Sequence, residues 1–233
     1  MIEQPSITSK AWHSESSEAV FQHLSCSAEG LSSDDARQRL EQFGPNRLRP
    51  ADKQGPLMRF LMQFHNVLIY VLLGAGVVTA LLGHWVDIAV IVGVVLINAI
   101  IGFIQEGKAE KALDAIRNML SQQAMIRRDG KFLSLPAEQV VPGDVIFLQS
   151  GDKVPADLRL FKSRELHIDE AMLTGESEPV EKHIEPVHQE ATIGDRINLA
   201  YSGTLVTFGQ GYGVVIASGD NTEIGRISGM LSQ

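Results

Sequence analysis

One short polar segment, Thr174-Gly175-Glu176-Ser177, carries the side chains that are best suited to do chemistry in this chain. A partner group can approach a carboxylate beside Gly175 closely, because glycine has no Cβ. The hydroxyls of Thr174 and Ser177 can position a water molecule or order the turn. Glu176 could then act as a general base toward water that attacks an acyl phosphate. The same four residues also suit an ordinary surface loop, so the surrounding segments must decide between the two interpretations.

The bulk composition excludes several classes of protein. The chain has 233 residues, a net charge of −8 and a single cysteine, Cys26. We expect no nucleic-acid partner, because there is no basic stripe to neutralise phosphates. A lone cysteine excludes an intramolecular disulfide and is typical of a reducing compartment, so Cys26 is predicted to be an inert, reduced thiol. The polar, Ser-rich start is not a secretory signal.

Residues 1–50 are predicted to form a small cytoplasmic helical module without chemistry of its own. Residues 1–13 are expected to be a disordered lead-in. Helical spacing follows from Ser16 to Leu24, and Ser32-Ser33-Asp34-Asp35 predicts the capped start of a second helix. Gly44-Pro45 ends that helix.

Two apolar segments, residues 67–82 and 88–104, contain no charged side chain. With their flanks, about 66–84 and 87–105, each is long enough to cross a hydrocarbon core of roughly 30 Å at about 1.5 Å per residue. Only five residues separate the two segments, so they would form a tight antiparallel hairpin within residues 51–120. The alternative is a pair of buried core helices.

Basic residues flank the hairpin on one side only, which predicts that both chain ends are cytoplasmic. Neither Lys nor Arg occurs between Gly83 and Asp87, whereas several precede the first segment or follow the second: Lys53, Arg59, Lys108, Lys111 and Arg117. From Gln105 the second helix continues with charged side chains spaced four apart, as expected of a stalk that leaves the bilayer. We therefore expect an integral membrane protein of the plasma (inner) membrane, in contact with lipid.

Residues 121–220 are predicted to form a β-domain, because the hydrophobic period changes from helical to two after Ala124. Met125–Leu133 has the pattern of a hairpin around Asp129-Gly130, and short strands with Gly-Asp turns follow. Such strands suggest an all-β jelly roll or barrel-like roll. Together with the helical segments, the fold class is an α+β membrane protein. Residues 221–233 start a further helix.

A metal site is not expected. An acidic segment, Glu181–Arg196, follows the candidate residues and contains four side chains that can bind metals: His183, Glu185, His188 and Glu190. Their spacing fits no standard zinc pattern, and a solvated loop explains them better.

Many motifs in a fixed order resemble the N-terminal part of a P-type ATPase, the ion-pump family with a phosphorylated aspartate. The resemblance covers about residues 16–233. The motifs are Phe43-Gly44-Pro45-Asn46, the stretch Asn98–Ala112, Pro142-Gly143-Asp144, Gly151-Asp152 with Pro155-Ala156-Asp157, Asp169-Glu170, Leu173-Thr174-Gly175-Glu176-Ser177, Pro179-Val180, Gly203-Thr204, and Gly219 with Thr222-Glu223-Ile224-Gly225.

The resemblance implies specific roles for these residues. The β-domain would be the actuator domain, which brings Glu176 against the aspartyl phosphate so that water can hydrolyse it. Thr174 and Gly175 would shape the loop at the phosphate, Ser177 would support the turn, and the Gly-Asp turns would be structural. The helix from residue 221 would lead toward a third span. The complete pump would use ATP and Mg²⁺ and carry a cation, with calcium-pump-like members the most similar; no residue of this chain is assigned to bind these cofactors.

The family's phosphorylation motif, D-K-T-G-T, does not occur among the 233 residues. The chain alone is therefore expected to be inactive and to require the remainder of the pump as a partner. It could be a truncated reading frame, a gene fragment or half of a split pump. The alternative is a non-catalytic, membrane-anchored module with a regulatory or binding role.

Overall fold

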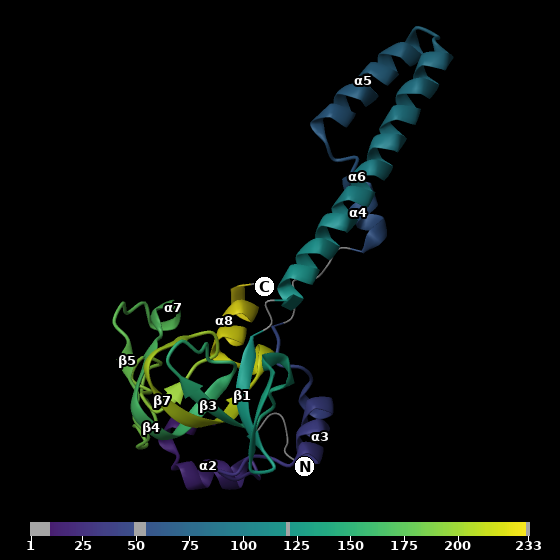
Figure 1. Cartoon of the computed structure of the whole chain (residues 1–233). Helices are drawn as coiled ribbons and strands as arrows, with labels where there is room; N and C mark the ends of the chain where they lie inside the picture. Colours follow the sequence, from purple (N-terminus) through teal and green to yellow (C-terminus); the bar gives the residue numbers. More distant parts are fainter. Residues whose placement is uncertain (1–9, 49–54, 120–121, 232–233) are drawn as a thin grey trace. The chain divides into compact units, whose positions relative to one another are not determined.

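The computed structural model describes residues 10–48, 55–119 and 122–231, which form a mixed α and β fold (Figure 1). The chain divides into two compact units. One combines the residues up to 49 with those from 121 onward and contains an antiparallel sheet. The other, residues 50–120, is helical.

Seven strands pair into one sheet in the order β2-β1-β3-β7-β4-β5, with β6 paired to β4. Each of these pairings is antiparallel. The two longest strands, β4 and β7, lie side by side over most of their length. The strands are β1 (Gln123–Arg128), β2 (Lys131–Pro136), β3 (Val145–Gln149), β4 (Asp157–Asp169), β5 (Val180–Glu181), β6 (Leu199–Ala200) and β7 (Leu205–Ala217). The finer expectation of a jelly roll stays a prediction.

The hairpin predicted around Asp129-Gly130 is confirmed. Arg128 pairs with Lys131, and the two turn residues have φ angles of 50° and 72°. Both angles lie in the left-handed region that a two-residue type I′ turn requires, which explains why this sequence gives a tight connection between β1 and β2.

Alternating apolar side chains of the sheet build the main core of this unit. On β4 the residues with even numbers near both ends are fully buried, and they meet buried side chains of β1, β3 and β7. The cluster includes Ile126, Ile146, Leu148, Leu158, Leu160, Leu166, Ile168, Val206 and Val215. This period of two is the pattern from which the strands were predicted.

The N-terminal helices α2 (Ser17–His23) and α3 (Ser33–Phe43) begin at serine caps. The predicted start of α3 is confirmed: the Ser32 hydroxyl oxygen accepts a hydrogen bond from the Asp35 amide at 3.0 Å. Gly44 at φ 77° ends the helix. Figure 1 shows α2 at the end of the sheet opposite α7 (Ala171–Thr174), the short helix that carries the candidate site.

The expectation of a disordered lead-in is wrong for residues 10–13, while residues 1–9 lie outside the described residues. Trp12 and His13 are buried in a 3₁₀ turn, η1 (Trp12–Ser14). Trp12 packs with α2 side chains against the sheet in one apolar cluster that also contains Val20, Leu24, Leu199, Tyr201, Val214 and Ile216. Burial of this large aromatic side chain against an apolar surface orders the segment, although the local sequence has no helical or strand period.

The single cysteine is half-buried between this cluster and a smaller one around Leu31. Burial raises the pKa of the Cys26 thiol to about 11, against a smaller opposing effect of Arg39. A thiol in such surroundings is a poor nucleophile, because the thiolate is the reactive form.

We expect iodoacetamide to alkylate Cys26 slowly in the folded chain at pH 8. With a pKa near 11, on the order of one thiol in a thousand is ionised at that pH, against roughly a quarter for a free cysteine. Intact-mass spectrometry of the folded chain and of the chain in guanidinium chloride should show a difference of about two orders of magnitude in rate. Rates within a few-fold of each other would contradict the burial of this thiol.

The helical unit contains α4 (Pro56–Met62), α5 (Val67–Leu81) and α6 (Trp85–Met119). The first apolar segment, predicted as 66–84, forms a helix of 15 residues, about 22 Å at 1.5 Å per residue. Asn66 explains its start, since its side chain accepts a hydrogen bond from the Leu68 amide at 2.9 Å and so caps α5. Gly83, at φ 77°, follows its end.

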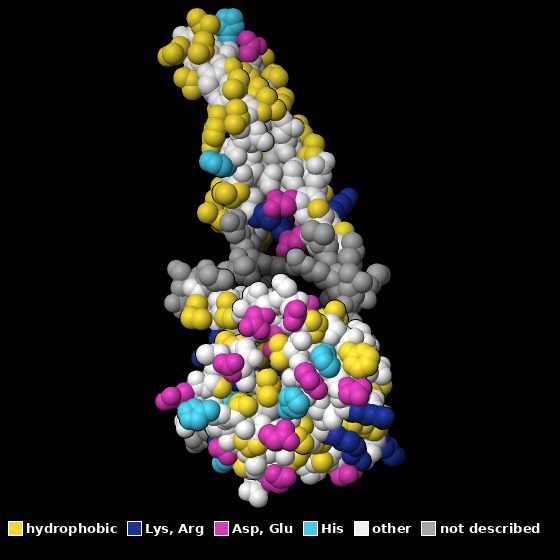
Figure 2. Space-filling model, turned by 90° about the vertical axis from the view of Figure 1, so that its left-hand side faces the viewer, with side chains coloured by type: hydrophobic (Ala, Val, Ile, Leu, Met, Phe, Trp, Pro, Cys, Tyr) yellow, Lys and Arg dark blue, Asp and Glu magenta, His cyan; other side chains and the backbone are white. Residues whose placement is uncertain are grey.

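By length and composition, α6 could cross a membrane over Trp85–Ala112, and α4 with α5 could do so only as one segment bent by 67°. Within this unit, the C-terminal half of α6 contacts α4 and Gln63, the residue that follows α4. Arg59 pairs with Glu110, Gln63 donates to Glu106 at 2.6 Å, and Phe60 lies edge-on to Phe103. The remainder of the hairpin exposes apolar side chains, which are yellow in Figure 2.

Candidate functional site

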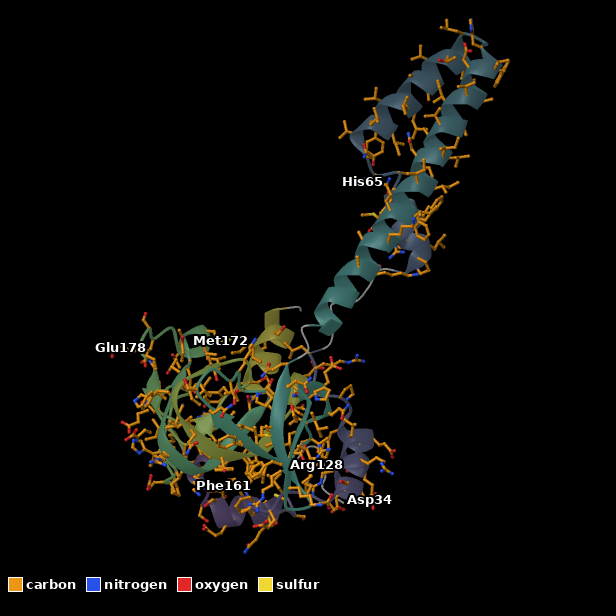
Figure 3. All side chains as sticks on the ribbon, in the orientation of Figure 1. Asp34, His65, Arg128, Phe161, Met172 and Glu178 are labelled. Carbon is orange, nitrogen blue, oxygen red and sulfur yellow. The ribbon has the colours of Figure 1, made fainter. Side chains whose placement is uncertain are left out.

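The candidate residues lie in the connection between β4 and β5, here named the Glu176 loop (residues 170–179). Its two ends are held together by antiparallel pairing of His167 with Glu181 and of Ile168 with Val180. Met172 and Glu178, on either side of the candidate residues, lie at the margin of the sheet unit in Figure 3, well apart from Phe161 and Arg128. The loop therefore projects from a paired base.

A single helical turn, α7, precedes Glu176. The Gly175 amide donates to the Ala171 carbonyl at 2.9 Å, and Gly175 itself has a φ of 76°. This left-handed conformation ends α7 and redirects the chain, which explains why glycine stands at this position. Apart from its two neighbours in sequence, no described residue has an atom within 4 Å of the place where a Cβ on Gly175 would be. The close approach predicted from the sequence is therefore sterically open.

Thr174 orders the turn. Its hydroxyl donates to the Glu170 carbonyl at 3.2 Å and accepts from the Glu176 amide, also at 3.2 Å. One side chain thus joins the start of α7 to the backbone of Glu176. The sequence suggested that this hydroxyl could order the turn, and its two hydrogen bonds join the residues of the turn in that way.

The carboxylate of Glu176 is exposed and has no hydrogen bond or ion pair among the described residues. Ser177 is exposed as well, and within the described part of the chain its hydroxyl makes no hydrogen bond to the turn. The structure thus brings Thr174, Gly175 and Glu176 together on one ordered turn, with Ser177 following in open space. An exposed, unpartnered carboxylate on a backbone held by hydrogen bonds can accept a proton from a water molecule on an incoming partner.

Sequence reasoning missed a buried ion pair at the base of the loop. Lys182 Nζ lies 2.7 Å from Glu170 Oε1, and both side chains are completely buried. Burial raises the pKa of Glu170, with the charge of Lys182 opposing, and burial lowers the pKa of Lys182, with the charge of Glu170 opposing. The sequence offers one weak indication of this burial, which is that Lys182 directly follows a short strand.

Both Gly-Asp turns that were predicted to be structural, and the neighbouring Asp157, make contacts within the fold. Asp152 Oδ2 accepts a hydrogen bond from the Gln149 amide at 3.0 Å. Asp144 forms a bidentate pair with Arg128 at 2.7 and 2.9 Å, and its Oδ2 also accepts from the Val141 amide. Asp157 is buried and accepts from the amides of Ser202 and Glu223 at 2.8 and 2.7 Å, which holds the start of α8 (Glu223–Leu231) against β4. Desolvation raises the pKa of Asp157 to about 7, against those two hydrogen bonds.

The four metal-binding side chains of the acidic segment do not gather. Among the residues that the structure describes, no three His, Cys, Asp or Glu side chains lie close enough together to hold a metal ion. The structure therefore offers no metal centre in the described ranges 10–48, 55–119 and 122–231.

Two family models match the chain. The P-type ATPase actuator domain matches residues 118–232, and the N-terminal domain of cation transporters and ATPases matches residues 12–79. The first match contains the sheet with the Glu176 loop, and the second contains α2, α3, α4 and most of α5.

Several curated relatives are similar over most of the chain. A probable cation-transporting ATPase F of Mycobacterium tuberculosis is 53% identical over 198 residues, which is 85% of this chain and 22% of the relative. The calcium-transporting ATPase of Listeria monocytogenes is 43% identical over 212 residues, 91% of this chain and 24% of the relative. The calcium-transporting ATPase of Bacillus subtilis is 39% identical over 204 residues, which is 87% of this chain and 23% of the relative.

The chain thus spans about a quarter of the length of these relatives. The matches agree with the ordered motifs and with an antiparallel sheet that carries the Glu176 loop. The chain belongs to the P-type ATPase family and contains the actuator and N-terminal domains of its cation-transporting members.

Proposed function

We propose that the Glu176 loop promotes hydrolysis of the aspartyl-phosphate intermediate of a cation pump. The observation that carries the proposal is the exposed carboxylate of Glu176, unpartnered on a turn whose backbone is held by Thr174. Glu176 orients the attacking water and accepts its proton, which is general base catalysis. The phosphorylated aspartate belongs to a part of the pump outside these 233 residues.

The neighbouring residues have positioning roles in this proposal. Thr174 sets the direction of the Glu176 backbone, and Gly175 leaves room for the phosphate because no Cβ stands there. Ser177 follows them in an exposed position, where its hydroxyl can position a water molecule. These roles need no metal ion or nucleotide bound to this chain; ATP and Mg²⁺ act at the phosphorylation and nucleotide domains of the pump.

We further propose that α5 and α6 insert into the plasma (inner) membrane as a hairpin, with both chain ends on the cytoplasmic side. The support is their exposed apolar surface, which would be costly in water. Lys and Arg residues precede the first helix of the hairpin and follow the second, and none lies in the connection between the two. The charged C-terminal part of α6 then acts as a stalk on the cytoplasmic side of the bilayer. The transported substrate is a cation.

A hybrid pump tests the function. This chain would replace the matching segment of the calcium-transporting ATPase of Listeria monocytogenes, which is 43% identical over 212 residues. We expect the hybrid to form a phosphoenzyme from ATP, to hydrolyse it, and to drive calcium into inside-out vesicles. Uptake also tests the topology, because it requires the β-domain and ATP on the same side. A hybrid whose phosphorylated aspartate is replaced by asparagine is the control for phosphorylation.

The result that overturns the proposal is equally specific. A hybrid that inserts and is phosphorylated like the parent, but whose phosphoenzyme does not decay, would show that this loop lacks the hydrolytic role.

A further inference from the structure

The buried pair of Glu170 and Lys182 joins the two ends of the Glu176 loop. Glu170 is the residue immediately before α7, and Lys182 is the residue immediately after β5. Their side chains meet at 2.7 Å, from Nζ to Oε1. The pair therefore joins the first residue of the loop to the chain just after β5, in addition to the short β4–β5 pairing of the backbone.

Lys182 belongs to the rigid side of this arrangement. Its amide donates to the Leu166 carbonyl at 2.7 Å, and its carbonyl accepts from the Ser163 hydroxyl at 2.8 Å. Both partners are on β4, which pairs with β5, β6 and β7. Its ammonium also lies 5.9 Å from the centre of the Tyr201 ring. Lys182 is thus held by the sheet whether or not the loop is in place.

Glu170 belongs to the loop side. Its carbonyl accepts three hydrogen bonds: from the Leu173 amide at 2.8 Å, from the Thr174 amide at 3.0 Å and from the Thr174 hydroxyl at 3.2 Å. The same hydroxyl holds the Glu176 amide. A displacement of Glu170 therefore passes through Thr174 to the backbone of Glu176.

The rest of the loop has few other supports. From Gly175 to Pro179 every residue is exposed. A helix of a single turn such as α7 is unstable by itself, because nucleation costs more than one or two hydrogen bonds return. Besides this ion pair, the described residues hold the loop through the pairing at its base, the half-buried Leu173 and a hydrogen bond of 3.0 Å from the Ala171 amide to Asp169 Oδ1.

We propose that Glu170 and Lys182 form a positioning pair that holds the Glu176 loop in its hydrolytic orientation through their opposite charges. Completely buried ion pairs often contribute little net stability, and apolar replacements of similar shape can be tolerated. What such replacements lose is the attraction between the two opposite charges, which holds Glu170 beside Lys182. This inference rests on the proposed function for its effect on hydrolysis, and on the contacts alone for its effect on loop order.

The decisive variant removes both charges while keeping similar volumes: Glu170→Gln with Lys182→Met. Single changes leave an uncompensated buried charge and can prevent folding. The matched control is Arg128→Met with Asp144→Asn, which removes another buried pair. Arg128 lies far from the loop residues Met172 and Glu178 in Figure 3.

The first measurement is hydrogen exchange of the full chain in detergent. In the Glu170→Gln/Lys182→Met variant we expect exchange at the Leu173, Thr174 and Gly175 amides to rise about tenfold or more, because local opening of the loop becomes easier. Exchange of the amides paired between β4 and β7 should stay unchanged. The control variant should leave the three loop amides at their original rates.

The second measurement is phosphoenzyme decay in the hybrid pump. We expect about a tenfold slowing with the rate of phosphorylation unchanged, and no further slowing when Glu176→Gln is already present, because the pair acts through Glu176. Normal exchange and normal decay in the double variant overturn the inference. Normal decay in Glu176→Gln alone overturns the proposed function instead, while the exchange result still decides the effect of the pair on the loop.

Discussion

Glu176→Gln is expected to slow decay of the phosphoenzyme in the hybrid pump by about 100-fold or more. A positioned general base contributes typically about 10²–10⁴-fold, and glutamine cannot accept the proton of the attacking water. The change keeps the size of the side chain and leaves the Glu176 amide bonded to Thr174. Formation of the phosphoenzyme should therefore be normal, so that the variant accumulates it.

A pulse of labelled ATP followed by excess unlabelled ATP measures this decay. Glu178→Gln is the matched control, since it removes an exposed carboxylate two residues away on the same loop. Neither change should alter the free energy of unfolding by more than about 0.5 kcal/mol, because exposed groups without partners contribute little. Equal decay rates for the Glu176 and Glu178 variants would refute the role assigned to Glu176.

Local signals explain what the sequence predicted well. The Ser32 cap, the Asp129-Gly130 turn and the glycine after α7 each act through hydrogen bonds or φ angles within four residues. The period of two also follows from one local rule where one face of β4 meets the main core, at Leu158, Leu160, Leu166 and Ile168. The turn of the Glu176 loop is of the same local kind, since its hydrogen bonds lie within residues 170–176, while its chemistry stays a prediction.

Contacts between distant segments explain what the sequence did not predict. Trp12 is buried because α2 and the sheet offer it an apolar surface, and no neighbour in sequence announces that surface. Lys182 is buried because Glu170, twelve positions earlier, provides the opposite charge. Polar residues in a core are readable from sequence only when both partners are known, since a lone lysine is normally exposed.

Arg159→Met is expected to release the N-terminal segment from the sheet. The Arg159 side chain is completely buried, and its guanidinium donates to four carbonyls: Trp12 at 3.2 Å, Glu15 at 2.9 Å, Ile184 at 3.0 Å, and Leu160. Burial lowers the pKa of Arg159 to about 10, so the group remains charged at neutral pH. It therefore joins η1 and the acidic segment to β4 by charge-assisted hydrogen bonds.

The expected loss in free energy of unfolding is at least about 3 kcal/mol, since each buried carbonyl left without its donor costs roughly 1–3 kcal/mol. Arg159→Lys should recover little, because one ammonium cannot reach partners that the planar guanidinium bonds in several directions. Asn198, which donates to the His13 and Glu185 carbonyls at 2.8 Å, holds the same two segments and limits the displacement.

Tryptophan fluorescence can follow this release directly. The chain has two tryptophans, and Trp85→Phe leaves Trp12 as the only reporter. In urea titrations of that background, Arg159→Met should expose Trp12 at a lower urea concentration than the parent. Arg164→Met, at an exposed position on the same strand, is the control and should change the free energy of unfolding by less than about 0.5 kcal/mol. If the two variants unfold alike, the four hydrogen bonds of Arg159 do not anchor the N-terminal segment.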